Sequence, residues 1–179
     1  MFQGEVITGA SPHQTTRKGI ARTFQTTRLF GDMTVSENIE LALRFGNSGI
    51  TGSEAIRKEI LRILAFVGLL AERDKIAKDQ PIANQKRVEI ARALATNPKL
   101  LLLDEVMAGL NPVEVSRSMA LITAIRKQGI TVFMIEHVMK AIMSVCDRII
   151  VFNHGRNIAD GTPNEVASDP TVIEIYLGK

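Results

Sequence analysis

The stretch KLLLLDEVMAGLNP, residues 99–112, places four leucines before two acids and closes with a Gly-Leu-Asn-Pro turn. So apolar a run is typical of a central strand of a parallel sheet, which is buried on both faces. Ligands of such sheets gather at the carboxyl ends of the strands, and this strand ends at Asp104 and Glu105. The stretch therefore predicts an α/β protein with two carboxylates at one edge of its sheet.

The sequence on either side alternates between strand and helix patterns. The order strand, helix, strand, helix, strand from residue 100 to residue 152 implies a parallel sheet with right-handed crossovers, whose strand at 130–137 is also expected to be buried. Residues 26–84 show no strand pattern, which predicts a helical sub-domain. Strands are expected over 4–9, 19–25, 100–105, 130–137, 148–152 and 157–160. Helices are expected over 34–46, 53–70, 84–96, 111–129 and 138–146, and a last one opens at 162–165.

Composition narrows the class of protein. A chain of 179 residues fits one domain with a sizeable core, and no apolar run approaches the ~20 residues needed to span a bilayer. The net charge of +3 is too small to indicate nucleic acid, and aromatic residues at 4% make a base-stacking surface improbable. The start has no signal-peptide pattern, and Cys146 is the one cysteine. These features predict a cytosolic protein that could still dock on a membrane protein.

Polar residues follow three of the expected strands and suggest a shared site. Glu136 and His137 end the strand at 130–137, and Gln25 ends the strand at 19–25. An Asp at the end of an apolar strand can hold the magnesium of a nucleotide through water, and the adjacent Glu105 could orient or deprotonate an attacking water. Each signal alone has a structural explanation, but their combination in one α/β pattern favours a site.

Four blocks of the sequence, in order and spacing, resemble an ABC-transporter ATPase over nearly the whole chain. The blocks are GIARTFQTTRLFGDMTVSENIELAL, QKRVEIARALATNPKLLLLDEVMAGLNP, TVFMIEHVMKAIMSVCDRIIVFNHGRNIADGTPNEV and TVIEIYLG. Three features look like the ATPases of branched-chain amino-acid importers: GIARTFQ followed by RLF, a D-loop that ends in Asn, and the VIEIYLG tail. The resemblance implies a partial P-loop NTPase core with a parallel sheet plus an α-helical sub-domain.

The resemblance also implies roles for individual residues. Asp104 matches the Walker B aspartate that binds Mg²⁺, Glu105 the general base, and His137 the switch histidine. Gln25 matches the Q-loop glutamine, a catalytic and metal-sensing residue that links to the membrane subunits. Contacts to the nucleotide across a subunit interface would come from the signature segment and the D-loop, which comprise Gln80, Pro81, Ile82, Ala83 and Asn84, and Ala108, Gly109, Leu110 and Asn111.

The same resemblance implies a division of the chain into four parts. Residues 1–25 would be a remnant of the N-terminal core that ends in the Q-loop, and residues 26–84 a helical sub-domain that receives the permeases. Residues 85–161 would form the α/β core, and 162–179 a helical tail. ATP and Mg²⁺ are the implied cofactors. The implied partners are a second ABC ATPase subunit and membrane permeases, without nucleic acid, on the cytoplasmic face of the cell membrane.

A phosphate loop of the form Gly-x4-Gly-Lys-Ser/Thr does not occur in the 179 residues. The nearest stretch, GEVITGAS at 4–11, has Ala10 in place of the Lys, and Pro12 follows where a helix should begin cleanly. By resemblance this stretch is the strand that comes after the loop, so the chain reads as N-terminally truncated without Walker A. Ala83 and Asn84 also replace the glycine and glutamine of the signature, and the Ala83 methyl is expected to hinder approach to a γ-phosphate.

Two functions from different classes remain open. The first is an ATP-hydrolysing importer subunit that is inactive as this chain alone, because the phosphates are not held. The second is a degenerate, non-catalytic subunit that only binds a partner ATPase or permease. An ABC-type ATPase of DNA repair is disfavoured by the short helical insert, where such proteins carry long coiled coils.

Overall fold

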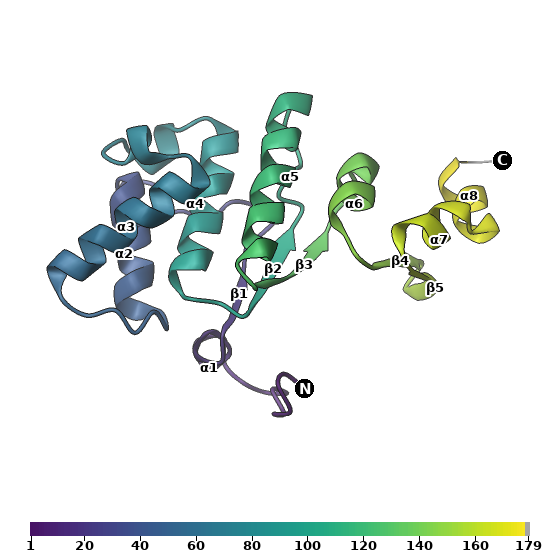
Figure 1. The fold of residues 1–179 in the computed structure, drawn as a ribbon, viewed down its shortest axis with the longest axis horizontal. Helices are drawn as coiled ribbons and strands as arrows, with labels where there is room; N and C mark the ends of the chain where they lie inside the picture. The colour runs from purple at the N-terminus through teal and green to yellow at the C-terminus, as the bar shows by residue number, and fades with distance from the viewer. Residues whose placement is uncertain (178–179) are drawn as a thin grey trace.

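A three-stranded parallel sheet lies at the centre of the computed structural model, which describes residues 1–177 (Figure 1). Its order is β1 (Ile20–Arg22), β2 (Leu100–Asp104) and β3 (Thr131–Ile135), with Leu101 opposite Ala21 on one side and Val132 on the other. Leu101 and Leu103 are fully or almost fully buried. The α/β class and the parallel sheet expected from residues 99–112 are therefore confirmed.

Helices fill the chain between β1 and β2. They are α2 (Val35–Phe45), α3 (Ser53–Val67) and α4 (Ile82–Ala95), with short 3-10 turns at Leu70–Glu72 and Ala77–Asp79. The Thr34 side chain accepts from the Glu37 amide and the Glu37 carboxylate accepts in return, which fixes the start of α2. Ile39, Leu64 and Val88 are completely buried. Within the described residues, no strand lies between 26 and 84, as expected.

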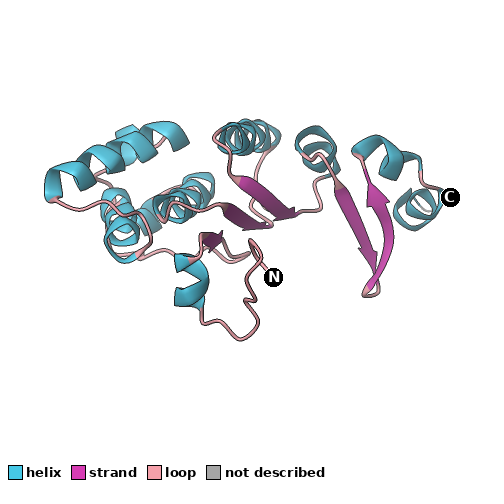
Figure 2. Cartoon of the chain, turned by 60° about the horizontal axis from the view of Figure 1, so that its bottom comes forward, coloured by secondary structure: helices cyan, strands magenta, loops and turns pink. Residues whose placement is uncertain are grey.

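Two helices follow the central strands. They are α5 (Pro112–Lys127), whose Ile122 and Ile125 are buried, and α6 (Met139–Val145). Figure 2 shows α5 and α6 over the same face of the sheet, whereas only the N-terminal segment lies on the opposite side. None of the helices within residues 1–177 combines the length and apolarity that crossing a bilayer demands.

The strand expected at 148–152 does not join the parallel sheet. It forms β4 (Ile149–Asn153), which pairs antiparallel with β5 (Arg156–Gly161) in a separate two-stranded sheet. The turn between them has positive φ at His154 and Gly155, as a tight hairpin requires. Figure 2 shows the hairpin beside β3 but apart from it. With α7 (Pro163–Ser168) and α8 (Pro170–Leu177) it encloses a small core of Val151, Val166 and Val172.

The N-terminal strand expected at 4–9 is wrong. Gly4 and Gly9 adopt positive φ values of 81° and 78°, and only an isolated bridge joins Phe2 to Glu5. A helix, α1 (Pro12–Arg17), follows with Ser11 as its N-cap. The expectation that Pro12 prevents a clean helix start is also wrong, because proline suits the first turn, where its missing N–H has no intrahelical partner anyway.

Strand β3 is less buried than its sequence predicts. Phe133 and Ile135 keep 52% and 55% of their surface exposed. They alternate with the half-buried Val132 and Met134, which pack against the main core. The prediction fails because β3 is the end strand of its sheet and one of its faces is left uncovered by the described residues.

Candidate functional site

Three of the expected site residues meet at one edge of the sheet. Asp104 ends β2, Glu105 follows it, and Gln25 lies three residues after the end of β1. Gln25 Nε2 donates a hydrogen bond of 2.9 Å to Glu105 Oε2. Arg22 donates to Asp104 Oδ2 at 3.0 Å, so one oxygen of that carboxylate is engaged in an ion pair. The strand ends thus bring together two carboxylates and one amide.

Glu105 sits in an unusual backbone conformation. Its φ is +46°, in the left-handed region that non-glycine residues rarely adopt. Its amide donates to the Ile135 carbonyl at 2.9 Å, and its own carbonyl accepts from Lys86 Nζ at 3.0 Å and from the Ala108 amide at 3.2 Å. Such conformations cost about 1–3 kcal/mol and persist where surrounding contacts determine them. Here contacts from β3 and α4 do so.

Three charged residues lie beside this turn: Lys86 and Glu89 on α4, which are buried, and Glu136 after β3, which is half-buried. Burial lowers the pKa of Lys86 and raises the pKa of Glu89 and of Glu136. Glu136 Oε1 accepts from the Met107 amide at 2.8 Å, and the Phe24 amide donates to Glu89 at 3.1 Å. Sequence reasoning missed Lys86 and Glu89. Their spacing of three residues, which places both on one helix face, was the available signal.

His137 lies at the same edge as Glu105 but does not touch it. It follows Glu136 after the end of β3, is exposed, and makes no side-chain hydrogen bond with the described residues. The structure therefore places His137 after the end of β3, at the carboxyl end of the sheet, and no hydrogen bond among the described residues joins its imidazole to Asp104 or Glu105.

The segment expected to act as the signature, residues 80–84, forms the start of α4. Gln80 is buried and its Oε1 accepts from Asn84 Nδ2 at 3.3 Å, while Pro81 precedes the first helical residue. Ile82 is exposed, but Ala83 is only 7% exposed. Ala83 is therefore largely covered by the chain itself, and its expected effect on the approach of a γ-phosphate stays a prediction.

The segment expected to act as the D-loop, residues 108–111, connects the turn after Glu105 to α5. Gly109 has a φ of +76° and open space where a Cβ would lie, and Asn111 is the N-cap of α5. No hydrogen bond among the described residues joins this segment to residues 80–84. The two are linked through the chain of contacts from α4 to the Glu105 turn.

The residues at the edge fit a magnesium ion better than they fit a triphosphate. No three His, Cys, Asp or Glu side chains in the described part of the chain gather closely enough to form a full metal cage. Magnesium needs only one or two carboxylates when water and phosphate complete its shell, so Asp104 with Gln25 suits it. A cradle of backbone amides is not offered by residues 4–11, where Gly4 and Gly9 lie in open turns.

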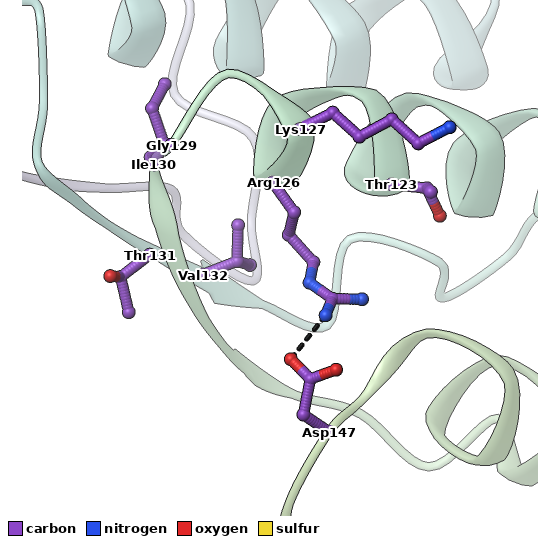
Figure 3. Close-up of a pocket in the computed structure, with 8 residues that line it drawn as sticks. All are labelled: Thr123, Arg126, Lys127, Gly129, Ile130, Thr131, Val132 and Asp147. Carbon is purple, nitrogen blue, oxygen red and sulfur yellow. Dashed lines mark hydrogen bonds and ion pairs between the residues drawn. The ribbon is translucent and has the colours of Figure 1, made fainter.

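A pocket of about 500 Å³ lies elsewhere, between the end of α5 and the start of β3 (Figure 3). Arg126 points into it and pairs with Asp147, and Arg126 also donates to the Val145 carbonyl at 2.5 Å. None of the expected site residues lines it. The pocket sits at the amino end of β3, opposite the edge that carries Glu136 and His137, and so it has no part in the candidate site.

Comparisons with known proteins give a consistent result. A family described as ABC transporter matches residues 1–108, and one described as branched-chain amino acid ATP-binding cassette transporter matches residues 156–179. The chain is 40% identical to BraF of Pseudomonas aeruginosa, a high-affinity branched-chain amino acid transport ATP-binding protein, over 99% of this chain and 75% of BraF. It is 37% identical to LivG of Escherichia coli, which carries the same description, over 100% of this chain and 75% of LivG.

Solved structures agree with the sequence comparisons. MJ1267, an ATP-binding cassette of an ABC transporter, superposes with a TM-score of 0.83 at 32% identity, over 98% of this chain and 75% of that one. MJ0796, an ATP-binding cassette whose dimer was solved in a post-hydrolysis state with ADP and Pi, superposes with a TM-score of 0.73 at 29% identity, over 82% of this chain and 64% of that one. The fold of this chain is thus similar to that of nucleotide-binding proteins.

Proposed function

Because this chain belongs to the ABC transporter family and is of the branched-chain amino acid type by similarity, we propose that it serves as the nucleotide-binding subunit of an importer for branched-chain amino acids. The observation that carries the proposal is the meeting of Asp104, Glu105 and Gln25 at one edge of the parallel sheet. BraF and LivG are named for this transport, and the alignment with each covers nearly all of this chain.

Each residue at the edge has a distinct task in the proposed reaction. Asp104 would hold magnesium through water, and the bound ion would neutralise charge on the phosphates of ATP. Glu105, oriented by the Gln25 amide, would position or deprotonate the attacking water. His137 would donate a hydrogen bond to the γ-phosphate, for which its exposed position after the end of β3 leaves it accessible. The ion pair with Arg22 must break before both oxygens of the Asp104 carboxylate are available to the magnesium site.

The proposed partners follow from the dimer of MJ0796 and from the names of the relatives. A second ATP-binding subunit would face residues 80–84 and 108–111 of this chain, and the helical part at 26–84 would receive the membrane permeases. The subunit would be located at the cytoplasmic face of the cell membrane.

We further propose that the 179-residue polypeptide does not hydrolyse ATP by itself. Its sequence contains no Gly-x4-Gly-Lys-Ser/Thr, and so the phosphates lack their main hydrogen-bond donors. Losing several such contacts costs several kcal/mol of binding, where about 1.4 kcal/mol is tenfold in affinity. The same observation favours the second candidate, a subunit that only binds its partners.

One pair of proteins tests both statements: the chain as it stands, and the chain with the phosphate-loop segment of BraF fused before Met1. We expect no magnesium-dependent turnover from the first and measurable turnover from the second. Glu105→Gln in the fusion should abolish that turnover, whereas Glu174→Gln on the exposed surface of α8 should leave it unchanged.

The outcomes separate the alternatives. Turnover by the unfused chain that is lost in Glu105→Gln would refute its proposed inactivity. A fusion that folds and binds ATP but never hydrolyses it would refute the role of Glu105 and leave the partner-binding subunit as the better description.

A further inference from the structure

Lys86 is a charged residue in a place where charged residues are rarely found. It lies in the second turn of α4, two residues after the segment 80–84, and is only 7% exposed. The ammonium group of a lysine this deeply buried needs hydrogen-bond acceptors or opposite charges inside the protein. Its Nζ does so by donating to the Glu105 carbonyl at 3.0 Å.

The bond from Lys86 acts on a residue whose backbone makes two other hydrogen bonds. The Glu105 amide is held by the Ile135 carbonyl of β3, and its carbonyl accepts from the Ala108 amide within the turn. Met107, two residues on, is held by the Glu136 carboxylate. Among the hydrogen bonds of residues 1–177, the one from Lys86 joins this turn to α4, since Ile135 and Glu136 both belong to the β3 side.

The direction of the Glu105 side chain depends on that backbone conformation. At a φ of +46° the Cα–Cβ bond points differently from that of an ordinary helical or extended residue. If the Lys86 bond is lost, the turn is free to relax toward a cheaper φ, and the carboxylate then leaves the position in which Gln25 Nε2 reaches it at 2.9 Å.

Charges around the ammonium favour its staying in place. Glu136, Glu89 and Glu105 all attract it, although burial lowers the pKa of Lys86. Glu136 faces it from the β3 side and Glu89 from its own helix. A neutral side chain of similar length would keep the packing but lose both the donor and the attraction.

We propose that Lys86 is a positioning residue, which fixes the left-handed backbone of Glu105 and thereby ties the carboxylate to the helix that begins at residues 80–84. The importance of this carboxylate for ATP hydrolysis rests on the proposed function. The geometric claim does not, and it is tested without nucleotide.

The test follows the side-chain amide signal of Gln25 by NMR in the ¹⁵N-labelled full chain. Glu105→Ala defines where this signal lies without its acceptor. We expect Lys86→Met to move the signal most of the way to that position. Lys86→Arg, which keeps the donors and the charge, should leave the signal near its position in the unsubstituted chain. Lys58→Met, an exposed lysine on α3, should leave it unmoved. An unmoved signal in folded Lys86→Met overturns the proposal.

A second measurement covers the case in which Lys86→Met does not fold. In the unsubstituted chain, a scalar coupling between Lys86 ¹⁵Nζ and the Glu105 carbonyl carbon reports the hydrogen bond directly. Its detection supports the proposal, and its absence overturns it. Neither readout involves ATP, so an unmoved Gln25 signal beside an active BraF fusion would reject the role of Lys86 alone.

Discussion

At the scale of single residues, Glu136 beside the candidate site has only one of its two carboxyl oxygens in a side-chain hydrogen bond among the described residues. One of its oxygens accepts from the Met107 amide, whereas Oε2 is buried without a partner among the described residues. Burial raises the pKa of Glu136, and the hydrogen bond from Met107 and the charges of His137 and Lys86 only partly oppose this. The folded protein therefore holds the Glu136 proton more tightly than the unfolded chain does.

This shift predicts a pH-dependent effect of Glu136→Gln. Above the ordinary glutamate value of 4.5, the folded state binds more protons at this site than the unfolded state, so the free energy of unfolding falls as the pH rises toward the raised pKa. The substituted glutamine cannot ionise and keeps an oxygen for the Met107 amide. We expect the variant to gain stability relative to the unsubstituted protein between pH 4 and pH 7, measured by urea unfolding. A difference that stays constant over this range, or reverses, would contradict the raised pKa of the half-buried Glu136 carboxyl.

The residues of the site differ in how far the sequence predicts them. Asp104, Glu105 and Gln25 follow from strand ends, because parallel strands must bring their carboxyl ends to one edge. Lys86 cannot be found that way, since its burial depends on how α4 packs against the turn after β2. The covered Ala83 methyl has the same cause: the helix begins before residue 84 and turns that side chain inward.

At the scale of elements, α5 shows how capping chemistry connects the site to the fold. Asn111 Oδ1 accepts from the Val113 and Glu114 amides, each at 3.0 Å, and the Glu114 carboxylate accepts from the Asn111 amide at 2.9 Å. Pro112 occupies the first turn. The start of α5 is therefore fixed just after the segment 108–111, which we propose to lie at a subunit interface.

We expect Asn111→Ala to lower the free energy of unfolding by about 1 kcal/mol, as loss of an N-cap typically does. Chemical denaturation measures this directly. Arg117→Ala, an exposed change on the same helix, is the matched control and should stay within about 0.5 kcal/mol of the parent. If both variants unfold alike, the cap contributes nothing and α5 is held by packing alone.

Elements with local signals are the ones that the sequence predicts well. The helices expected over 34–46 and 111–129 both form, and each begins with a capping box whose residues, Thr34 with Glu37 and Asn111 with Glu114, can be read from the sequence. The strand at 4–9 is wrong because its glycines favour turns, a preference that alternating hydrophobicity does not report. The burial of β3 and the sheet membership of β4 depend on which segments cover the sheet. The hydrophobic pattern within each strand does not contain that information.

At the scale of the whole molecule, the end strand β3 presents a surface suited to association. Its apolar side chains Phe133 and Ile135 are about half exposed, and its outer edge has no strand partner within residues 1–177. An apolar edge strand of this kind is a site where chains pair with one another. We expect the isolated chain to self-associate as its concentration rises, as measured by light scattering.

Substitutions locate the contact. Phe133→Thr with Ile135→Thr keeps the strand preference and removes apolar surface worth about 2–4 kcal/mol if fully buried on association, so the mass should shift toward the monomer. Phe45→Thr, which removes an isolated side chain that is 78% exposed at the end of α2, should not change it. A monodisperse monomer at high concentration would rule out association through β3.

The hairpin of β4 and β5 carries a consequence for motion. It has its own cluster of Val151, Val166 and Val172, and no backbone bond within the described residues ties β4 to β3. Its attachment runs through α6 and the Arg126 pair with Asp147 beside the pocket. So small a cluster opens at a lower free energy than the central sheet. We therefore expect residues 149–177 to open locally, to exchange their amide protons first and to be the first segment that a protease cuts, while the sheet edge around Asp104 stays folded.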